Sequence, residues 1–555
     1  MQPLASGGQS GTMFGSPCGL REPGKGVFPN RRCASERGRS RCGWIDPKPM
    51  QSLALPFLIY YLSVVAVVCV YGLHRYWMVW AFLRSRRTKG PESHAAVMEP
   101  LPRVTVQLPM FNERRVAERI IEAACAIDYP RDRLQIQVLD DSTDESATIA
   151  EACCASLREA GNNVEYVHRH NREGFKAGAL ARGLETATGD FIAVFDADFV
   201  PPAGILHDTI HHFTVPAIGM VQARWSHLNR DDSLLTQVQA MYLDGHFVIE
   251  QAARSRNGRW FNFNGTAGVW RRTTIEDAGG WHHDTLTEDT DLSYRAQLRG
   301  WKFRYLPDVC CPAEVPPTVS AFLSQQHRWN KGLIQTAIKL LPTILRSDAS
   351  IRTKIEAWFH LTSPLVHLFI LLLVLLVLPA MFVTLPLRHA SPWMSIGLGV
   401  LFLILGALAA CTFYLASQRA QGLGMWKTLL RLPALMAIGV GISVVNSRAV
   451  VEAIFGRQSP FVRTPKYNGD TVSEIDPVVK RQRRLIPNGA LEIALGLLMT
   501  ACVVMSVLRP HTIVATPFLI LFAAGYLAIG IPALRATLTK HGHGVESIPA
   551  NPAAA

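Results

Sequence analysis

Long apolar runs occur toward both ends of the chain, while residues 100–345 have the mixed apolar and polar pattern of a globular domain. A run of about twenty apolar residues is long enough to cross a bilayer as a helix. The pattern therefore predicts a soluble domain inserted between membrane helices. The predicted spans are 53–83, 358–385, 395–416, 489–508 and 512–534.

The stretch 433–455 is also long enough to span, but it carries Ser443, Asn446, Arg448 and Glu452 and has basic segments on both sides. Basic flanks favour the cytoplasmic side. We therefore expect an interfacial or re-entrant helix here, which leaves five spans. The predicted parts are 50–89, 100–345, 358–416, 433–455, 456–488, 489–534 and the cytoplasmic tail 535–555.

Residues 1–49 are rich in Gly, Ser and Arg and show no hydrophobic periodicity, which predicts a disordered basic extension. In this topology the positive charge of the extension would lie on the side of the membrane opposite the cytoplasm, whereas basic residues are usually found on the cytoplasmic side. Translation starting at Met50, directly before the first span, is an alternative.

The formal net charge is +13, which also suits a nucleic-acid-binding protein. The basic residues, however, adjoin apolar runs, as in Arg84 to Arg87 and Lys480 to Arg484. This distribution favours cytoplasmic loops of a membrane protein and argues against a nucleic-acid partner. We expect a multi-pass inner or plasma membrane protein with its central domain in the cytoplasm and its cysteines reduced.

In the central domain, strand-like runs alternate with helical patterns. The strands are predicted at 104–111, 134–140, 164–169 and 191–196, and the helices between them at 114–127, 145–160 and 176–187. This alternation predicts an α/β domain with a mostly parallel sheet, and such sheets bind ligands at the carboxyl ends of their strands.

Acidic residues follow three of these strands, as Glu113, Asp140-Asp141 and Asp196-Ala197-Asp198. Each could instead cap a helix, because Asp and Asn are good N-caps. Three such groups at one edge predict a shared site. Asp196 and Asp198 alternate at a strand end and could bind a hard divalent cation.

Four signatures stand in the order that resembles the processive, cellulose synthase-like family 2 glycosyltransferases. They are Asp140-Asp141, Asp196-Ala197-Asp198, Thr287-Glu288-Asp289 and the QxxRW motif from Gln325 to Trp329. The resemblance covers residues 100–345 and continues more loosely to 468. It implies a GT-A type fold, and VQLPMFNER and IQVLDDSTD are most similar to members that make β-1,4-mannan or xyloglucan backbones.

The resemblance assigns Glu113 with Asp140 or Asp141 to the nucleotide, and Lys176 to the diphosphate of a nucleotide-sugar donor. A solvated lysine at a helix start is the alternative for Lys176. Asp196 and Asp198 would hold Mg²⁺ or Mn²⁺ on the diphosphate.

Asp289, beside Glu288, would be the general base that takes the proton of the acceptor hydroxyl. A helix cap is the alternative for one of these two acids. Gln325, Arg328 and Trp329 would bind the acceptor. An aromatic residue at the membrane interface is the alternative for Trp329.

The sequence Phe461-Val-Arg-Thr464-Pro-Lys466 resembles the gating loop that closes over the donor in cellulose synthases. The family form has Val where this chain has Arg463. A cytoplasmic gating loop would also support a non-crossing helix at 433–455.

The resemblance implies an inverting transferase that polymerises a β-linked glucan or mannan from UDP-glucose or GDP-mannose. The alternatives are a non-processive enzyme that makes a glycolipid, and a transporter with an inactive enzyme domain. The expected partners are the donor, a glycan or lipid acceptor and the bilayer; a homo-oligomer and export partners in the cell envelope are left open.

Overall fold

A seven-stranded sheet forms the centre of the globular region between the apolar helices. The computed structural model describes residues 47–88, 96–383, 399–457, 489–508 and 515–538 and the single positions 397, 466 and 513. The described residues from Ser52 onward form one compact unit. The strands are β1 (Val104–Met110), β2 (Leu134–Asp140), β3 (Val164–His168), β4 (Phe191–Val194), β5 (Ile218–His227), β6 (Gly268–Arg271) and β7 (Lys302–Ala313).

The strand order is β3-β2-β1-β4-β6-β5-β7. Strands β1 to β4 are parallel to one another, and β5 is parallel to β7, while β6 lies antiparallel between β4 and β5. The sheet is thus mixed but mostly parallel. The carboxyl ends of β1, β2 and β4 meet at one edge, as predicted.

Helices cover the sheet and connect its strands. They are α2 (Ala117–Cys125), α3 (Ser146–Glu159), α4 (Phe175–Thr186), α5 (Ile205–Ile210), α6 (Leu234–Asp244), α7 (Ala252–Arg256), α8 (Arg272–Asp277) and α9 (Glu288–Leu298). Two short 3-10 turns, Arg131–Arg133 and His211–Thr214, precede β2 and β5, and a π-helical stretch, η3 (Gly245–Gln251), joins α6 to α7.

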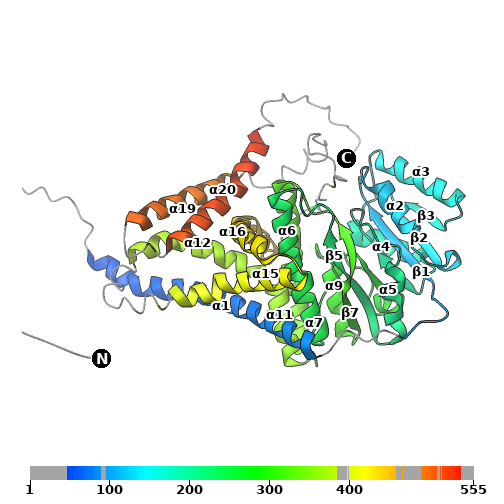
Figure 1. Ribbon diagram of the computed structural model, residues 1–555, viewed down its shortest axis with the longest axis horizontal. Helices are drawn as coiled ribbons and strands as arrows, with labels where there is room; N and C mark the ends of the chain where they lie inside the picture. Colours follow the sequence, from blue (N-terminus) through cyan, green and yellow to red (C-terminus); the bar gives the residue numbers. More distant parts are fainter. Residues whose placement is uncertain are drawn as a thin grey trace, which may run out of the picture. The chain divides into compact units, whose positions relative to one another are not determined.

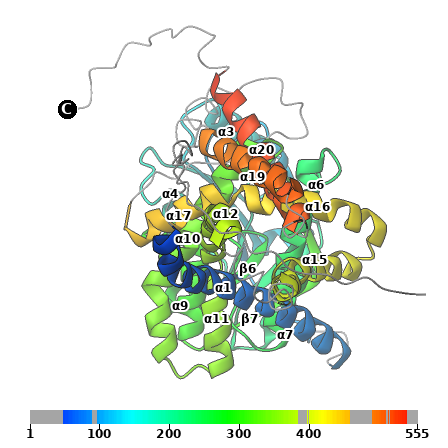
Figure 2. The same cartoon turned by 90° about the vertical axis from the view of Figure 1, so that its left-hand side faces the viewer.

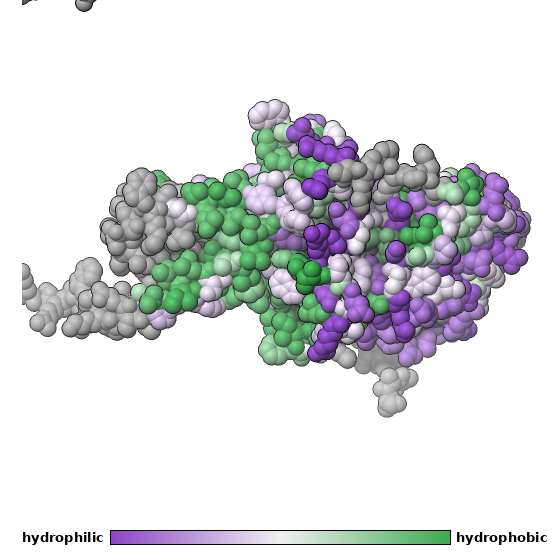
Figure 3. All heavy atoms as spheres, turned by 90° about the horizontal axis from the view of Figure 1, so that it is seen from below, coloured by the Kyte–Doolittle hydropathy of each residue, from purple (hydrophilic) through white to green (hydrophobic). Residues whose placement is uncertain are grey.

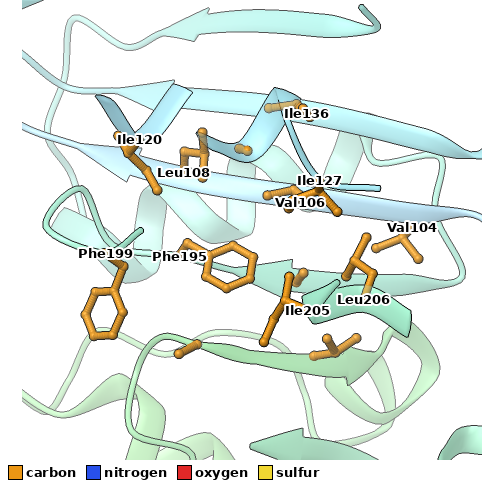
Figure 4. Packing of buried hydrophobic residues seen from close by; sticks show 14 of the residues in the cluster. Val104, Val106, Leu108, Ile120, Ile127, Ile136, Phe195, Phe199, Ile205 and Leu206 are labelled. Atoms are coloured by element: carbon orange, nitrogen blue, oxygen red, sulfur yellow. The ribbon is translucent and has the colours of Figure 1, made fainter. Parts of the chain in front are cut away.

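Alternating side chains of the parallel strands form the core on one face of the sheet. Val104, Val106 and Leu108 of β1 point to the same side and pack with Ile136, Phe195, Ile205 and Leu206 (Figure 4). All seven are almost fully buried. Their burial removes apolar surface from water, and this is the main favourable term that holds the strand ends in register.

The remaining helices follow the sheet or precede it. They are α1 (Pro47–Thr88), α10 (Val319–Arg346), α11 (Ile351–Thr362), α12 (Leu365–Val383), the π-helical η4 (Leu403–Leu408), α15 (Ala409–Ala420), α16 (Met425–Gly441), α17 (Ser443–Ile454), α19 (Ala490–Leu508) and α20 (Thr516–Leu538).

Six helical segments of the described chain are long and apolar enough to span a membrane: 54–87, 365–382, 399–420, 425–454, 490–508 and 516–536. Figure 1 shows α12, α19 and α20 gathered away from β1 to β3, and Figure 2 shows these three helices from their own end of the molecule. On the face seen in Figure 3, hydrophobic residues predominate over the helical part of the molecule, and hydrophilic residues predominate over the sheet domain. The architecture is consistent with membrane insertion around a GT-A type domain.

The segment predicted at 433–455 begins earlier than expected and is broken. Helix α16 ends at Gly441, and α17 starts at Ser443. A side chain at Gly441 would lie 2.4 Å from the Gly525 carbonyl of α20, and the Ser443 hydroxyl bonds to Tyr526, also of α20. Ser443 and Asn446 are buried, and Glu452 pairs with Lys331 of α10, while Arg448 is exposed. The non-crossing course of this segment stays a prediction.

Several predicted features lie outside the described residues. They are positions 1–46 of the basic extension, 539–555 of the tail, the loop 384–396, and 458–488 of the gating segment except Lys466. Phe461 and Thr464 belong to this set.

Candidate active site

A cavity of about 160 Å³ lies at the carboxyl ends of β1, β2 and β4. Its walls contain most of the residues predicted to form the site: Glu113, Asp141, Lys176, Asp196, Asp198, Glu288, Asp289, Gln325, Arg328, Trp329 and Lys466. Four separated sequence signatures and the described residue of the gating segment thus meet in one place.

The backbone is strained around this cavity. Three non-glycine residues of the described chain have positive φ, namely Asn112, Phe175 and Ala267. Asn112 follows β1 beside Glu113, Phe175 precedes Lys176, and Ala267 lies two residues after Gly265. Strain of this kind clusters at functional sites, because it is kept only where the surroundings hold it.

The pair Asp140-Asp141 is divided between two environments. Asp140 lies outside the cavity wall, where its carboxylate accepts hydrogen bonds from the Ser142 amide (2.9 Å) and the Tyr166 hydroxyl (2.8 Å). Asp141 lines the cavity, and Arg169 donates to both its oxygens at 2.7 and 2.6 Å. Neither caps the following helix, whose N-cap is Glu145. Of the two acids, only Asp141 faces the space where a ligand would lie.

Next to Asp141, an aromatic ring and a guanidinium form a flat wall. The Arg172 guanidinium carbon lies 3.3 Å from the centre of the Phe111 ring, and both side chains line the cavity beside Glu113. Planar groups of this kind stack well on other planar groups. This wall could hold a heterocyclic base.

Two lysines neutralise the acids that follow β4. The Lys176 ammonium lies 2.6 Å from Asp196 and 3.9 Å from Glu288, and it donates to the Gly265 carbonyl at 2.8 Å. The Lys466 ammonium contacts Asp198, which is buried. Burial lowers the pKa of Lys176, but Asp196 and Glu288 outweigh it and raise that pKa above its usual value. Lys176 therefore stays charged and is a cation built into the cavity wall.

The carboxylates of Asp196 and Asp198 fit a hard divalent cation. Both follow the end of β4 and both line the cavity. In the structure Asp196 is paired with the Lys176 ammonium and Asp198 with the Lys466 ammonium. Carboxylate oxygens are the ligands that Mg²⁺ and Mn²⁺ prefer. Arg119 supports this strand end, because it donates to the Glu314 carboxylate (2.6 Å) and to the Asp198 carbonyl (3.4 Å).

Asp289 lies in the first turn of α9. One carboxylate oxygen, Oδ1, accepts from the Thr290 amide at 2.6 Å, so the helix start holds the side chain in place. The other oxygen, Oδ2, faces Gly265, where an added Cβ would lie 3.1 Å away. Burial and the neighbouring Glu288 raise the pKa of Asp289 to about 7, against the opposing effect of Lys176. A carboxylate with such a pKa is suited to exchange protons near neutral pH.

Helix α10 presents the QxxRW residues on one face, because positions three and four residues apart neighbour each other on a helix. Gln325, Arg328 and Trp329 all line the cavity. Burial lowers the pKa of Arg328, while Glu288, Asp196, Asp289 and Asp198 act in the opposite direction. The guanidinium thus lies within electrostatic range of all four acids.

A second cavity of about 640 Å³ extends from this site into the apolar helices. Residues shared by both cavities are Trp225, Leu243, Asn264, Thr287, Asp289 and Trp329. The larger cavity has apolar walls from α12, α16 and α20, but it also has polar and charged side chains, including Arg75, His246, Glu250 and Arg254. A polar ligand can therefore reach from Asp289 toward the membrane helices.

Sequence reasoning missed Trp225, His246, Asn264 and Gly265. Asn264 joins the two cavities and bonds to His246 at 2.9 Å, while His246 bonds to Glu250 at 3.1 Å. The π-helical turn that carries His246 and Glu250 gives no clear periodicity in the sequence. The polar, glycine-containing run NFNG, residues 262–265, is the local sequence feature that could have indicated a functional loop. Its glycine, Gly265, has a φ of 82° and lies beside Lys176 and Asp289.

The chain has relatives of known classification. Residues 102–332 match the family described as "Glycosyltransferase like family 2". Glucomannan 4-beta-mannosyltransferase 2 of Arabidopsis thaliana is 45% identical over 262 residues, which cover 46% of this chain and 48% of that protein. Glucomannan 4-beta-mannosyltransferase 7 of the same plant is 34% identical over 415 residues, which cover 72% of this chain and 71% of that protein. For most of the curated relatives it matches, the chain spans about half their length.

Among solved structures, the chain is similar to a mannosyltransferase from Pyrobaculum calidifontis in complex with GDP-mannose and Mn²⁺. It is 20% identical, has a TM-score of 0.43, and covers 74% of this chain and 100% of that one.

Proposed function

This chain belongs to glycosyltransferase family 2, in the cellulose synthase-like group of the glucomannan 4-beta-mannosyltransferases, and we propose that it polymerises a β-linked mannan or glucomannan from GDP-mannose. The names of its relatives support mannose as the transferred sugar. UDP-glucose is the second donor that the family resemblance suggests.

The position of Asp289 is the observation that carries the proposal. Asp289 and Trp329 line both the strand-end cavity, with its acids and cations, and the larger cavity that runs into the apolar helices. A transferase that extends a chain needs a base between its donor and its acceptor. Asp289 lies at that junction.

In this mechanism, the donor lies with its base near Asp141 and the Phe111 wall and its diphosphate near Lys176 and Arg328. The acceptor sugar rests on Trp329 with its hydroxyl at Asp289. The hydroxyl oxygen forms a bond to the anomeric carbon as the bond from that carbon to the diphosphate oxygen breaks. The proton of the acceptor hydroxyl passes to Asp289 Oδ2 as the new bond forms, so Asp289 acts as a general base. Attack from the face opposite the diphosphate inverts the anomeric configuration.

Cationic groups compensate the charge that develops on the departing diphosphate. Lys176 and Arg328 are fixed in the wall, and Lys466 contacts Asp198. Asp196 and Asp198 would hold Mg²⁺ or Mn²⁺, which supplies further stabilisation of the leaving group.

The walls of the larger cavity favour a glycan acceptor over a lipid. Arg75, His246 and Arg254 line it, each paired with Glu250 at 3.1 to 3.4 Å. The hydrogen-bonding positions that these pairs leave open can bind sugar hydroxyls, whereas a lipid tail offers them no partner. A polymer that grows at Asp289 would pass between the membrane helices. The catalytic domain would then lie on the cytoplasmic side, which is also the side that the positive-inside rule favours for the basic loops.

The test is a donor panel. Purified full-length protein in lipid nanodiscs is given Mn²⁺ or Mg²⁺ with labelled GDP-mannose, UDP-glucose or other nucleotide sugars, and the product is analysed by size and linkage. We expect a long β-1,4-linked product from GDP-mannose. A single-sugar lipid as the main product would refute polymerisation and establish the glycolipid alternative.

A further inference from the structure

Trp225, near the end of β5, forms part of the wall between the two cavities. It is one of the six residues that both cavities share, together with Asp289 and Trp329. None of the four sequence signatures includes it. Because it lines both cavities together with the predicted base, Trp225 is placed to contact a ligand during transfer.

The backbone holds this side chain in a fixed direction. The register between β5 and β7 shifts directly before it, where Ala223 pairs with Leu306 but Arg224 pairs with Cys310. The Arg224 guanidinium lies at that irregularity and donates to the Pro307 carbonyl (2.7 Å) and to the side-chain oxygen of Gln421, directly after α15 (2.7 Å). Since neighbouring residues of a strand point to opposite faces, anchoring Arg224 turns Trp225 toward the cavities.

Trp225 and Trp329 form an aromatic corner. Their ring centres are 6.5 Å apart, and the rings are inclined at 56°. Phe247 and Phe199 support Trp225 from other sides, with ring centres at 4.9 and 5.2 Å. A corner of two inclined rings offers one aromatic face to the C–H side of a sugar ring and a second wall to its edge.

The indole N–H of Trp225 is buried and has no hydrogen-bond acceptor among the described residues. A buried donor without a partner is costly, and buried Trp N–H groups usually find an acceptor. The side chain borders the cavities, so a ligand that fills them can supply the missing oxygen. A sugar hydroxyl or ring oxygen is such an acceptor, and a hydrocarbon tail is not.

We infer that Trp225 is a further acceptor-binding residue, which packs with Trp329 around the terminal sugar of the growing glycan and donates a hydrogen bond from its indole N–H to an oxygen of that sugar. This inference rests on the proposed function, because it takes the acceptor to be a glycan. It adds a second tryptophan to the residues that the QxxRW motif contributes.

Two substitutions separate the ring from its N–H group. Trp225→Phe keeps an aromatic wall and removes the donor, and Trp225→Leu removes both. Trp301→Phe is the matched control, since its indole N–H bonds to Asp277 away from both cavities. The readouts are the Kd of β-1,4-mannotetraose and cellotetraose for the full-length protein in detergent, the KM of GDP-mannose, and the thermal unfolding temperature.

We expect Trp225→Phe to weaken tetrasaccharide binding by about 3- to 10-fold, the range of one hydrogen bond, and Trp225→Leu to weaken it further. The donor KM of Trp225→Phe should match that of Trp301→Phe. Its unfolding temperature should be at least as high, because the change removes a buried donor that has no partner among the described residues. Unchanged tetrasaccharide binding in both Trp225 variants would overturn the inference, and so would a parallel loss of donor binding and thermal stability.

A set of single-deoxy oligosaccharides tests the hydrogen bond itself. Removing the hydroxyl that bonds to Trp225 should weaken binding to the wild type but cost little in Trp225→Phe, since the two changes remove one interaction. If the loss of affinity from each deoxy sugar is the same in Trp225→Phe as in the wild type at every hydroxyl position, a direct hydrogen bond is contradicted. If the wild-type protein binds neither tetrasaccharide, the proposed polymerase function itself fails, a result that differs from failure of the Trp225 variants alone.

Discussion

The Lys176 ammonium lies 2.6 Å from the Asp196 carboxylate and also donates to the Gly265 carbonyl at 2.8 Å. This pairing keeps a positive charge at the end of β4, where the diphosphate of a donor would lie. We predict that Lys176→Met raises the KM of the nucleotide sugar by about 10- to 100-fold, since charge-assisted contacts to phosphate each contribute about 1.5–3 kcal/mol. Lys302→Met, at the exposed start of β7, is the control. Equal donor KM values in the two variants would refute the diphosphate role.

Gly265 leaves room for both Lys176 and Asp289. An added Cβ would lie 3.1 Å from Asp289 Oδ2 and 3.4 Å from Lys176 Nζ, and the residue has a φ of 82°. Gly258 also has positive φ, at 63°, but a Cβ there meets nothing within 4 Å. Both Gly→Ala changes should therefore lower the unfolding temperature to a similar extent, at a cost of about 1–2 kcal/mol. Only Gly265→Ala should lower kcat strongly. Similar kcat values for the two variants would show that Asp289 tolerates the methyl group.

The pH dependence of transfer follows from Asp289. Burial and Glu288 raise its pKa to about 7, and a general base works only when it is deprotonated. The transfer rate should therefore be level above pH 7 and fall about tenfold per pH unit below it. Single-turnover rates with saturating donor, measured between pH 5.5 and 8.5, check this profile. Donor binding over the same range is the control, and a rate that does not change across it would exclude a base with this pKa.

Removal of divalent cations should abolish transfer. Asp196 and Asp198 offer carboxylate oxygens at one strand end, and we expect that the nearby lysines do not replace a divalent ion on a diphosphate. Chelation with EDTA should reduce sugar incorporation to background, and Mn²⁺ should restore it in the wild type but not in Asp198→Asn. Full activity after exhaustive chelation would show that Lys176, Arg328 and Lys466 suffice.

The sequence predicted β1 to β4 well, because their apolar runs alternate with clear helical patterns and end in acidic residues. It did not predict β5, β6 and β7. β6 does not follow the β-α-β alternation that identifies β1 to β4, and β7 has a register shift opposite Ala223 and Arg224 of β5. Antiparallel pairing of β6 between β4 and β5 depends on contacts between distant residues.

The sequence predicted which residues form the site, but it did not predict how their side chains are oriented. The sequence pattern identified Asp289, Asp196 and Lys176. It could not show which of Asp140 and Asp141 faces the cavity. That depends on their partners Tyr166, on the neighbouring β3, and Arg169, just after β3. Trp225 belongs to no motif. The larger cavity could not be predicted, because its walls come from α1, η3, α12, α16 and α20, which are separated by hundreds of residues.

The central claim is that Asp289 takes the proton of an acceptor hydroxyl during glycan extension. Asp289→Asn keeps the size of the side chain and removes the base. In nanodiscs with Mn²⁺ and labelled GDP-mannose, this variant should bind the donor with the wild-type Kd, while incorporation of labelled mannose into polymer falls by at least about 1,000-fold, within the range that general-base catalysis contributes. Incorporation within tenfold of the wild-type rate would contradict the assignment of the base and, with it, the account of the site.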